Sequence, residues 1–157
     1  MNFKIGDLVI HCREGLAKIS SINEVDGRDF YIVISQRQGN ETIYVPVDRA
    51  DLIVRPLMNE KEADEILEYM RGISLEFNRN TKQRRDLYKK KLSSGDVYEL
   101  SYLFRQYQLC KKYPDEVKLG QVDIDMLSYA TNNLLDEFAL SYNVPREKVE
   151  EFIYSRL

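Results

Sequence analysis

The sequence predicts an α+β protein in which a small antiparallel β-barrel precedes an all-helical domain. Apolar and polar residues alternate in short runs as far as Pro56, and beyond it the apolar residues recur at helical spacing. This change in periodicity within 157 residues favours two small domains. We expect them to comprise residues 1–56 and residues 57–157.

The first domain contains several short strand candidates separated by turn residues. Asp26-Gly27 is the strongest hairpin signal, and Gly39-Asn40 provides the next turn. Strands at this spacing, with no helix long enough for a crossover, predict an antiparallel meander that closes into an SH3- or Tudor-like barrel. The candidates are Asp7 to His11, Leu16 to Ile22, Phe30 to Ser35 and Thr42 to Val45.

The last of these candidates has the composition of an edge strand. Every residue from Thr42 to Val45 is β-branched or aromatic, and Pro46 lacks the N–H that a central strand needs. An edge strand can pair with another protein.

The second domain is predicted to contain about five helices. Gly72 ends the first of them, and Asp96 is a natural N-cap for a helix that continues to about Lys112. Asp123 can cap the next, and Pro145 starts the last.

Charge is segregated along the chain, although its net value is only −3. Between Ser74 and Ser93 there are seven basic and two acidic residues, whereas from Pro114 onward there are nine acidic and four basic residues. A local basic cluster on an acidic protein indicates an anionic partner that binds at this cluster.

The basic cluster lies on a predicted helix from Thr81 to Leu92. Lys82, Arg85 and Lys89 fall at i, i+3 and i+7, where like charges repel, so an external anion such as phosphate would stabilise them. The alternative is a solvated charged face without a ligand. Tyr88, next to the cluster, is a candidate DNA contact.

The residue inventory argues against an enzyme and predicts neither a metal site nor a cofactor. His11 is the only histidine, and its neighbour Cys12 would point to the opposite face of a strand, so the two cannot form a nucleophilic pair. Cys12 and Cys110 lie in no metal-type spacing. A site built from carboxylates alone stays open. Without a signal peptide or a membrane-spanning run, we expect a cytoplasmic monomer with no membrane partner.

Several segments resemble the CarD/CdnL family of bacterial RNA polymerase-binding regulators. In the first half they are Phe3 to Ile10 with Gly15, Thr42 to Val47, and Asp51 to Pro56. That half also resembles the polymerase-interaction domain of transcription-repair coupling factors. Arg84-Arg85 followed by Leu92-Ser93-Ser94-Gly95-Asp96-Val97 is similar to the family motif RR…L-x-SGD, which decides in favour of CarD/CdnL.

The resemblance implies a non-catalytic transcription regulator with two partners. The barrel would bind the polymerase β subunit through its edge strand, which is Glu41, Thr42, Ile43, Tyr44, Val45 and Pro46 here. The helical domain would contact promoter DNA, weakly and without reading sequence, near the upstream edge of the transcription bubble and stabilise the open complex. The DNA-contacting residues would be Lys82, Arg84, Arg85, Tyr88 and Lys89. The alternative is a polymerase adaptor that binds protein only.

Two positions depart from the family pattern. The early Tyr-Pro-x-His-Gly turn is His11-Cys12-Arg13-Glu14-Gly15 here. Many members carry a tryptophan two residues before the Arg-Arg pair, where it wedges into the minor groove, but this chain has Lys82 there.

Overall fold

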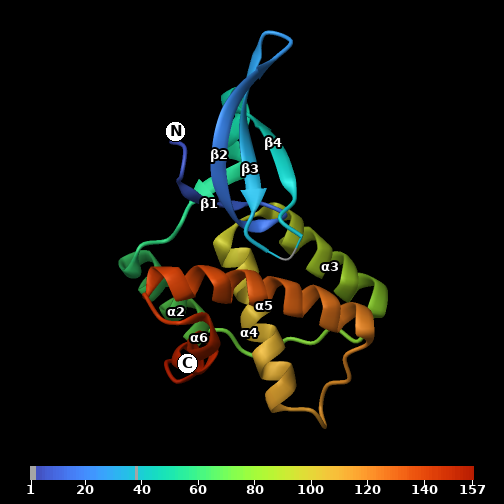
Figure 1. The fold of residues 1–157 in the computed structure, drawn as a ribbon. Coiled ribbons are helices and arrows are strands. Elements are labelled where there is room, and N and C mark those ends of the chain that lie inside the picture. The colour runs from blue at the N-terminus through green and yellow to red at the C-terminus, as the bar shows by residue number, and fades with distance from the viewer. Residues whose placement is uncertain (1–2, 38) are drawn as a thin grey trace. The chain divides into compact units, whose positions relative to one another are not determined.

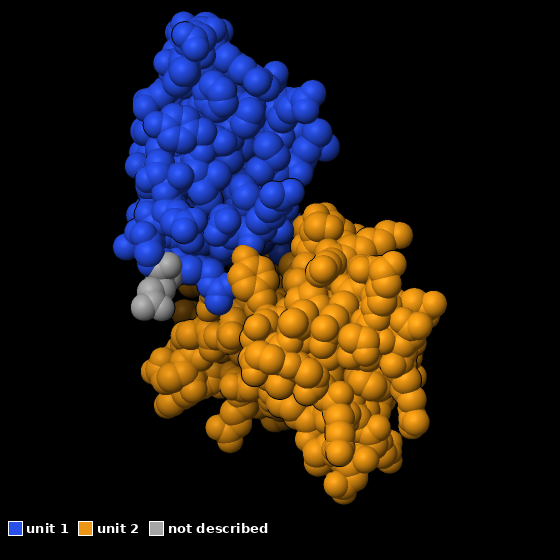
Figure 2. Space-filling model, turned by 90° about the vertical axis from the view of Figure 1, so that its right-hand side faces the viewer, with its two compact units in different colours: residues 1–57 blue, residues 58–157 orange. Residues whose placement is uncertain are grey.

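The chain forms two compact units, residues 1–57 and residues 58–157, which are coloured separately in Figure 2. The computed structural model describes residues 3–37 and 39–157. Figure 1 traces the strands of the first unit and the long helices of the second. The α+β class that the sequence predicts is therefore confirmed.

The first unit is a five-stranded antiparallel sheet with the order β4-β3-β2-β1-β5. Asp26 and Gly27, both with positive φ, form the tight turn between β2 and β3, as predicted. A 3-10 turn at Val47–Arg49 and one helical turn, α1 (Ala50–Ile53), connect β4 to β5. The strands are β1 (Leu8–His11), β2 (Gly15–Val25), β3 (Arg28–Ser35), β4 (Thr42–Pro46) and β5 (Val54–Pro56).

The sheet is open, and the closed SH3-like barrel that we expected is not observed. The last strand is only three residues long and pairs with β1. Among the described residues, no ladder joins β5 to β4, so β4 lies at one edge of the sheet and β5 at the other. One face of the sheet carries the core of the unit, whose members include Val9, Ala17, Ile19, Tyr31, Val33 and Val45.

His11 holds the tight turn between β1 and β2. Its Nδ1 accepts hydrogen bonds from the backbone N–H groups of Arg13 and Glu14, each 3.1 Å long. An acceptor at Nδ1 requires the neutral imidazole. Burial lowers the pKa of His11; the nearby Glu14 carboxylate opposes this effect and the Arg13 guanidinium adds to it.

We therefore expect acid to destabilise the first unit through His11. A lowered pKa in the folded state means that the unfolded chain binds the proton first, so stability falls as pH drops below about 6.5. The slope is at most about 1.4 kcal/mol per pH unit for one proton. Hydrogen exchange of sheet amides at pH 7.5 and pH 5 should show this loss. His11→Asn, which keeps an acceptor but does not titrate, should flatten the dependence, and an unchanged slope in this variant would contradict the assignment.

The second unit consists of helices packed around one core. The predicted helix ends at Gly72, Asp96 and Lys112 are confirmed, and the Asp96 carboxylate accepts a hydrogen bond from the backbone N–H of Tyr98. Phe104 and Phe138, both fully buried, meet edge to face with ring centroids 6.2 Å apart. The helices are α2 (Glu60–Arg71), α3 (Thr81–Ser94), α4 (Val97–Lys112), α5 (Gln121–Ser141) and α6 (Arg146–Tyr154). Among the described residues, none of these helices is long and apolar enough to cross a membrane.

Candidate functional site

Helix α3 carries the predicted DNA-contacting residues and divides them between two sides. Arg84 and Tyr88, one turn apart, point into the core and are 5% and 2% exposed. Lys82 and Lys89 are exposed, and Arg85 is partly exposed. The last three residues form what we call the α3 basic strip: Lys82, Arg85 and Lys89.

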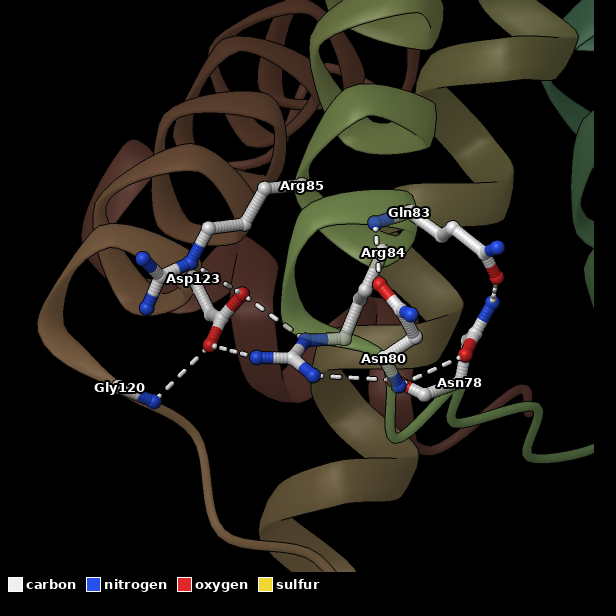
Figure 3. A network of polar contacts seen from close by, with 7 residues as sticks. All are labelled: Asn78, Asn80, Gln83, Arg84, Arg85, Gly120 and Asp123. Carbon is white, nitrogen blue, oxygen red and sulfur yellow. Dashed lines mark hydrogen bonds and ion pairs between the residues drawn. The ribbon is translucent and has the colours of Figure 1, made fainter.

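Arg84 is a structural residue that clamps three segments of the second unit together (Figure 3). Its Nε and Nη2 donate to the two carboxylate oxygens of Asp123 on α5, at 3.0 and 2.8 Å. Its Nη1 donates to the backbone carbonyl of Asn78, at 2.9 Å. The guanidinium carbon also lies 4.6 Å from the centroid of the Phe77 ring. Contact of Arg84 with DNA stays a prediction, and this geometry does not favour it, because the side chain is 5% exposed and three of its five N–H donors are used inside the protein.

Asp123 receives these bonds at the start of α5. The helix begins at Gln121 with Gly120 as its N-cap, so the prediction that Asp123 is the cap was wrong by one turn. Asp123 instead reaches back from the first turn and accepts the backbone N–H of Gly120 at 3.0 Å. Burial by itself would raise the pKa of the Asp123 carboxyl, but the bonds from Arg84 and Gly120, with the charges of Arg84 and Arg85, hold it below its usual value.

Tyr88 lies on the buried side of α3, one turn beyond Arg84. Burial raises the pKa of its hydroxyl to about 12. A ring that is 2% exposed offers no open face for stacking on a base, so this geometry does not favour the prediction that Tyr88 contacts DNA.

Arg85 contributes to both the interior and the surface. Its Nε lies 3.5 Å from Oδ1 of Asp123, while its side chain remains 32% exposed. A Cβ at Gly120 would come within 2.9 Å of Arg85 Nη2, so the guanidinium lies directly against the chain before α5 (Figure 3). Lys82 and Lys89 are more exposed than Arg85 and keep with it the spacing i, i+3, i+7. Asp86 and Lys90 are also exposed on this helix.

The predicted polymerase-binding segment lies at an edge of the sheet, as its composition indicated. Strand β4 pairs with β3 from Thr42 opposite Ile34 to Pro46 opposite Phe30. Its other side has no partner strand among the described residues. Thr42 and Tyr44 are exposed, Ile43 and Pro46 are half-buried, and Val45 is buried in the core; Glu41, just before the strand, is exposed.

The hydrogen-bond pattern identifies which backbone groups of β4 face outward. The N–H of Ser35 donates to the carbonyl of Glu41 at 2.9 Å, so these two residues form a hydrogen-bonded pair. Such pairs alternate with pairs that make no ladder bonds. Thr42 and Tyr44 occupy the alternate positions, and their N–H and C=O groups therefore point to the free edge. Pro46 is the next outward position, where its missing N–H breaks no bond to β3.

Comparison with known protein families matches both units. Residues 3–58 match the CarD-like/TRCF RID domain, and residues 65–154 match the CarD C-terminal domain. The second match covers more than half of the chain and distinguishes it from coupling factors, which share the first domain type. The chain belongs to the CarD family. CarD family proteins are non-catalytic transcription regulators that interact with RNA polymerase.

The structure gives the residues of the CarD motif in this chain a folding role. The first arginine of Arg84-Arg85 clamps α3 to α5, as described above. Gly95 ends α3 with a φ of 69°, in the left-handed region that glycine tolerates best. Asp96 then caps α4, and the Ser94 hydroxyl accepts the Asp96 N–H at 3.2 Å. These residues fix the α3–α4 corner of the CarD C-terminal domain.

Proposed function

We propose that this CarD protein binds the β subunit of RNA polymerase through strand β4, contacts promoter DNA through the α3 basic strip, and stabilises the open complex. The unpaired edge of β4 supports the polymerase contact and carries the proposal. It belongs to the RID domain, the part of the chain that matches a polymerase-interacting family. The DNA contact would lie near the upstream edge of the transcription bubble.

Strand β4 suits addition of a partner strand better than most edges. Natural edge strands are usually protected by charged residues, bulges or covering loops. Residues Thr42 to Pro46 include no charged side chain. The two outward N–H groups, of Thr42 and Tyr44, can donate to an extended segment of the β subunit, with main-chain bonds supplying affinity.

The α3 basic strip suits phosphate contact but not base reading. Its cations are spread over two turns of one helix, and phosphate contacts of this kind position a protein without specifying sequence. Of the five predicted contacts, Arg84 and Tyr88 are buried, which leaves Lys82, Lys89 and part of Arg85 to meet DNA. We infer weak, salt-sensitive binding that depends on polymerase to bring the strip to the promoter.

The burial of Arg84 and Tyr88 also favours the second candidate function. A polymerase adaptor that binds protein only would need β4 and no DNA contact, and the strip would then meet an acidic protein surface. The two functions differ in what happens when the strip loses its charge. Only a regulator that contacts DNA should then show both a changed lifetime of the promoter complex and a lower salt dependence of promoter binding.

A charge reversal in the strip tests the DNA contact. Lys82→Glu with Lys89→Glu should shorten the half-life of the open complex severalfold and leave binding to free polymerase unchanged. The salt slope of promoter binding should fall by about two units, one for each phosphate that the variant no longer neutralises. Lys61→Glu with Lys148→Glu, exposed lysines of α2 and α6, is the matched control. If both double variants behave alike, the adaptor function replaces the proposal.

Lys82 itself allows a sharper test, because it stands where many family members have tryptophan. A tryptophan can wedge into the minor groove and unstack a base step, whereas a lysine can only pair with phosphate. We expect Lys82→Trp to lengthen the half-life of the open complex and Lys82→Ala to shorten it. The same half-life in all three proteins would mean that residue 82 does not face DNA.

A further inference from the structure

An aromatic side chain stands exposed beside the free backbone of β4. Tyr44 is 57% exposed. One side of its ring packs on Phe30 of β3, with centroids 6.2 Å apart and the rings inclined by 65°. Phe30 is supported in turn by Arg28, whose guanidinium carbon lies 5.6 Å from the Phe30 centroid. We call Tyr44, Phe30 and Arg28 the edge stack.

The edge stack is held in place by neighbouring contacts. Arg28 Nη2 lies 3.1 Å from Oδ1 of Asp48, just beyond the end of β4. Ile32, directly opposite Tyr44 on β3, is 7% exposed. The ring of Tyr44 is therefore packed on one side and open on the side where a partner strand would be added. A preorganised side chain of this kind loses little entropy on binding.

A strand added to β4 would place one of its side chains directly against Tyr44. Neighbouring strands lie about 4.8 Å apart, and side chains of opposed residues on one face stand with Cβ atoms about 4.5–5.5 Å apart. On this face β4 offers only Thr42, Tyr44 and Pro46. Ile43 and Val45 point to the core face, where Val45 is fully buried. Recognition by side chains therefore depends mainly on Tyr44.

The chemistry around Tyr44 favours an apolar group. The nearest charged side chain of the stack, Arg28, already has a carboxylate partner in Asp48 and is separated from Tyr44 by Phe30. A carboxylate laid on the Tyr44 ring would lose water without gaining a partner, and a cation would gain only a cation–π contact of about 0.5–1 kcal/mol in exchange for its lost water. An aliphatic or aromatic one would bury apolar area and gain ring contact.

We propose that Tyr44 is the specificity-determining residue of this edge, and that it selects an extended polymerase segment with an aliphatic or aromatic side chain directly opposite it. Phe30 and Arg28 are positioning residues that act through the Tyr44 ring. This inference rests on the proposed binding of polymerase through β4, and adds to it the chemical class of the residue that is recognised.

The test measures the affinity of the full-length chain for purified RNA polymerase core enzyme with variants at residue 44. We expect Tyr44→Phe to bind within about threefold of the wild type, and Tyr44→Ala to bind at least about tenfold more weakly, as truncated aromatic anchors do. Tyr44→Gln, which is long but polar, should resemble alanine. Thr42→Ala, on the same face, is the matched control and should lose less than about threefold. Because Tyr44 is exposed, these variants should keep the fold, which circular dichroism can verify.

A double-mutant cycle tests the role of Phe30. Phe30→Leu should weaken binding in the wild-type background and have little effect in the Tyr44→Ala background, because it acts by placing the ring. Equal losses in both backgrounds would overturn the positioning role of Phe30.

The outcomes separate this inference from the function on which it rests. If wild-type protein fails to bind polymerase, the proposed function fails and the inference with it. If the wild type binds but Tyr44→Ala binds equally well, only the inference fails. If Tyr44→Arg binds as tightly as the wild type or more tightly, the partner presents a polar or charged group there, which overturns the assignment of an apolar one.

Discussion

Asp123→Ala is expected to lower the free energy of unfolding of the helical unit by about 3–5 kcal/mol, because it leaves the buried guanidinium of Arg84 without its partner. The carboxylate of Asp123 is fully buried, and its two oxygens accept hydrogen bonds from Nε and Nη2 of Arg84 and from the N–H of Gly120. Each of these donors would then be left in the interior. Urea unfolding followed by helical circular dichroism measures the loss.

Matched variants separate the buried pair from general effects of charge. Arg85→Ala removes a partly exposed cation that lies 3.5 Å from the same carboxylate, and should cost less than about 1 kcal/mol. Replacing both members of the pair, as Arg84→Met with Asp123→Leu, should cost less than the sum of the two single losses, because no unpaired charge remains. If Asp123→Ala and Arg85→Ala cost the same, the pair does not contribute as the geometry indicates.

Because the pKa of Asp123 is lowered, the stability that the Arg84–Asp123 pair contributes depends on pH. A carboxyl whose pKa is lower in the folded state contributes stability that is present above its unfolded pKa of about 3.9 and is lost as pH falls through the folded value. Acid unfolding of the helical unit should therefore include a contribution from this group. In Asp123→Asn that contribution should be absent, and the acid limb of the stability curve should be shallower.

The burial of Arg84 changes how the basic helix can be studied. A variant that reverses charge at both Arg84 and Arg85 would break the buried ion pair and destabilise the helical unit, so it would not test DNA contact alone. Lys82 and Lys89 are the residues whose reversal leaves the core intact, because both are exposed. Any loss of promoter binding in an Arg84 variant reports on folding.

Local signals in the sequence identified the elements correctly where a few neighbouring residues determine the structure. Asp26-Gly27 predicts its turn because both residues tolerate positive φ, and Asp96 predicts a helix start because its side chain bonds the backbone two residues on. The edge position of β4 followed from Pro46 in the same way. Closure of the barrel could not be predicted from such local signals, since it depends on how far a short last strand reaches around the sheet.

The role of Arg84 illustrates what the sequence leaves open. Arg84, Tyr88 and Leu92 are spaced at four residues and lie on one side of a helix, so periodicity alone indicates a buried arginine. A buried arginine needs an anion, but its partner is 39 residues away in the chain. With no local pattern connecting the two residues, the resemblance to the family and the local basic charge placed Arg84 among the expected DNA contacts. The aromatic contact between Phe30 and Tyr44 was missed for a similar reason, because it joins two strands through their register.

The backbone of β4 allows a test of strand addition that does not depend on any side chain. Thr42 directs its N–H away from β3, so Thr42→Pro removes a donor from the free edge and leaves the β3–β4 ladder intact. We expect the protein to remain folded, because a proline is tolerated at an edge position whose N–H faces away from the ladder. Its affinity for RNA polymerase should nevertheless fall.

The size of that loss follows from the bond that cannot form. A hydrogen bond contributes about 0.5–1.5 kcal/mol net, and a carbonyl left unpaired at the interface adds to the loss, for a total of about 1–3 kcal/mol. This corresponds to about 5- to 150-fold weaker binding. Thr42→Ala keeps the N–H and should bind nearly as well as the wild type. Ile43→Pro removes an N–H that faces β3 and should unfold the sheet. Folded Thr42→Pro protein that binds polymerase with unchanged affinity would exclude strand addition at β4, whatever residue 44 contributes.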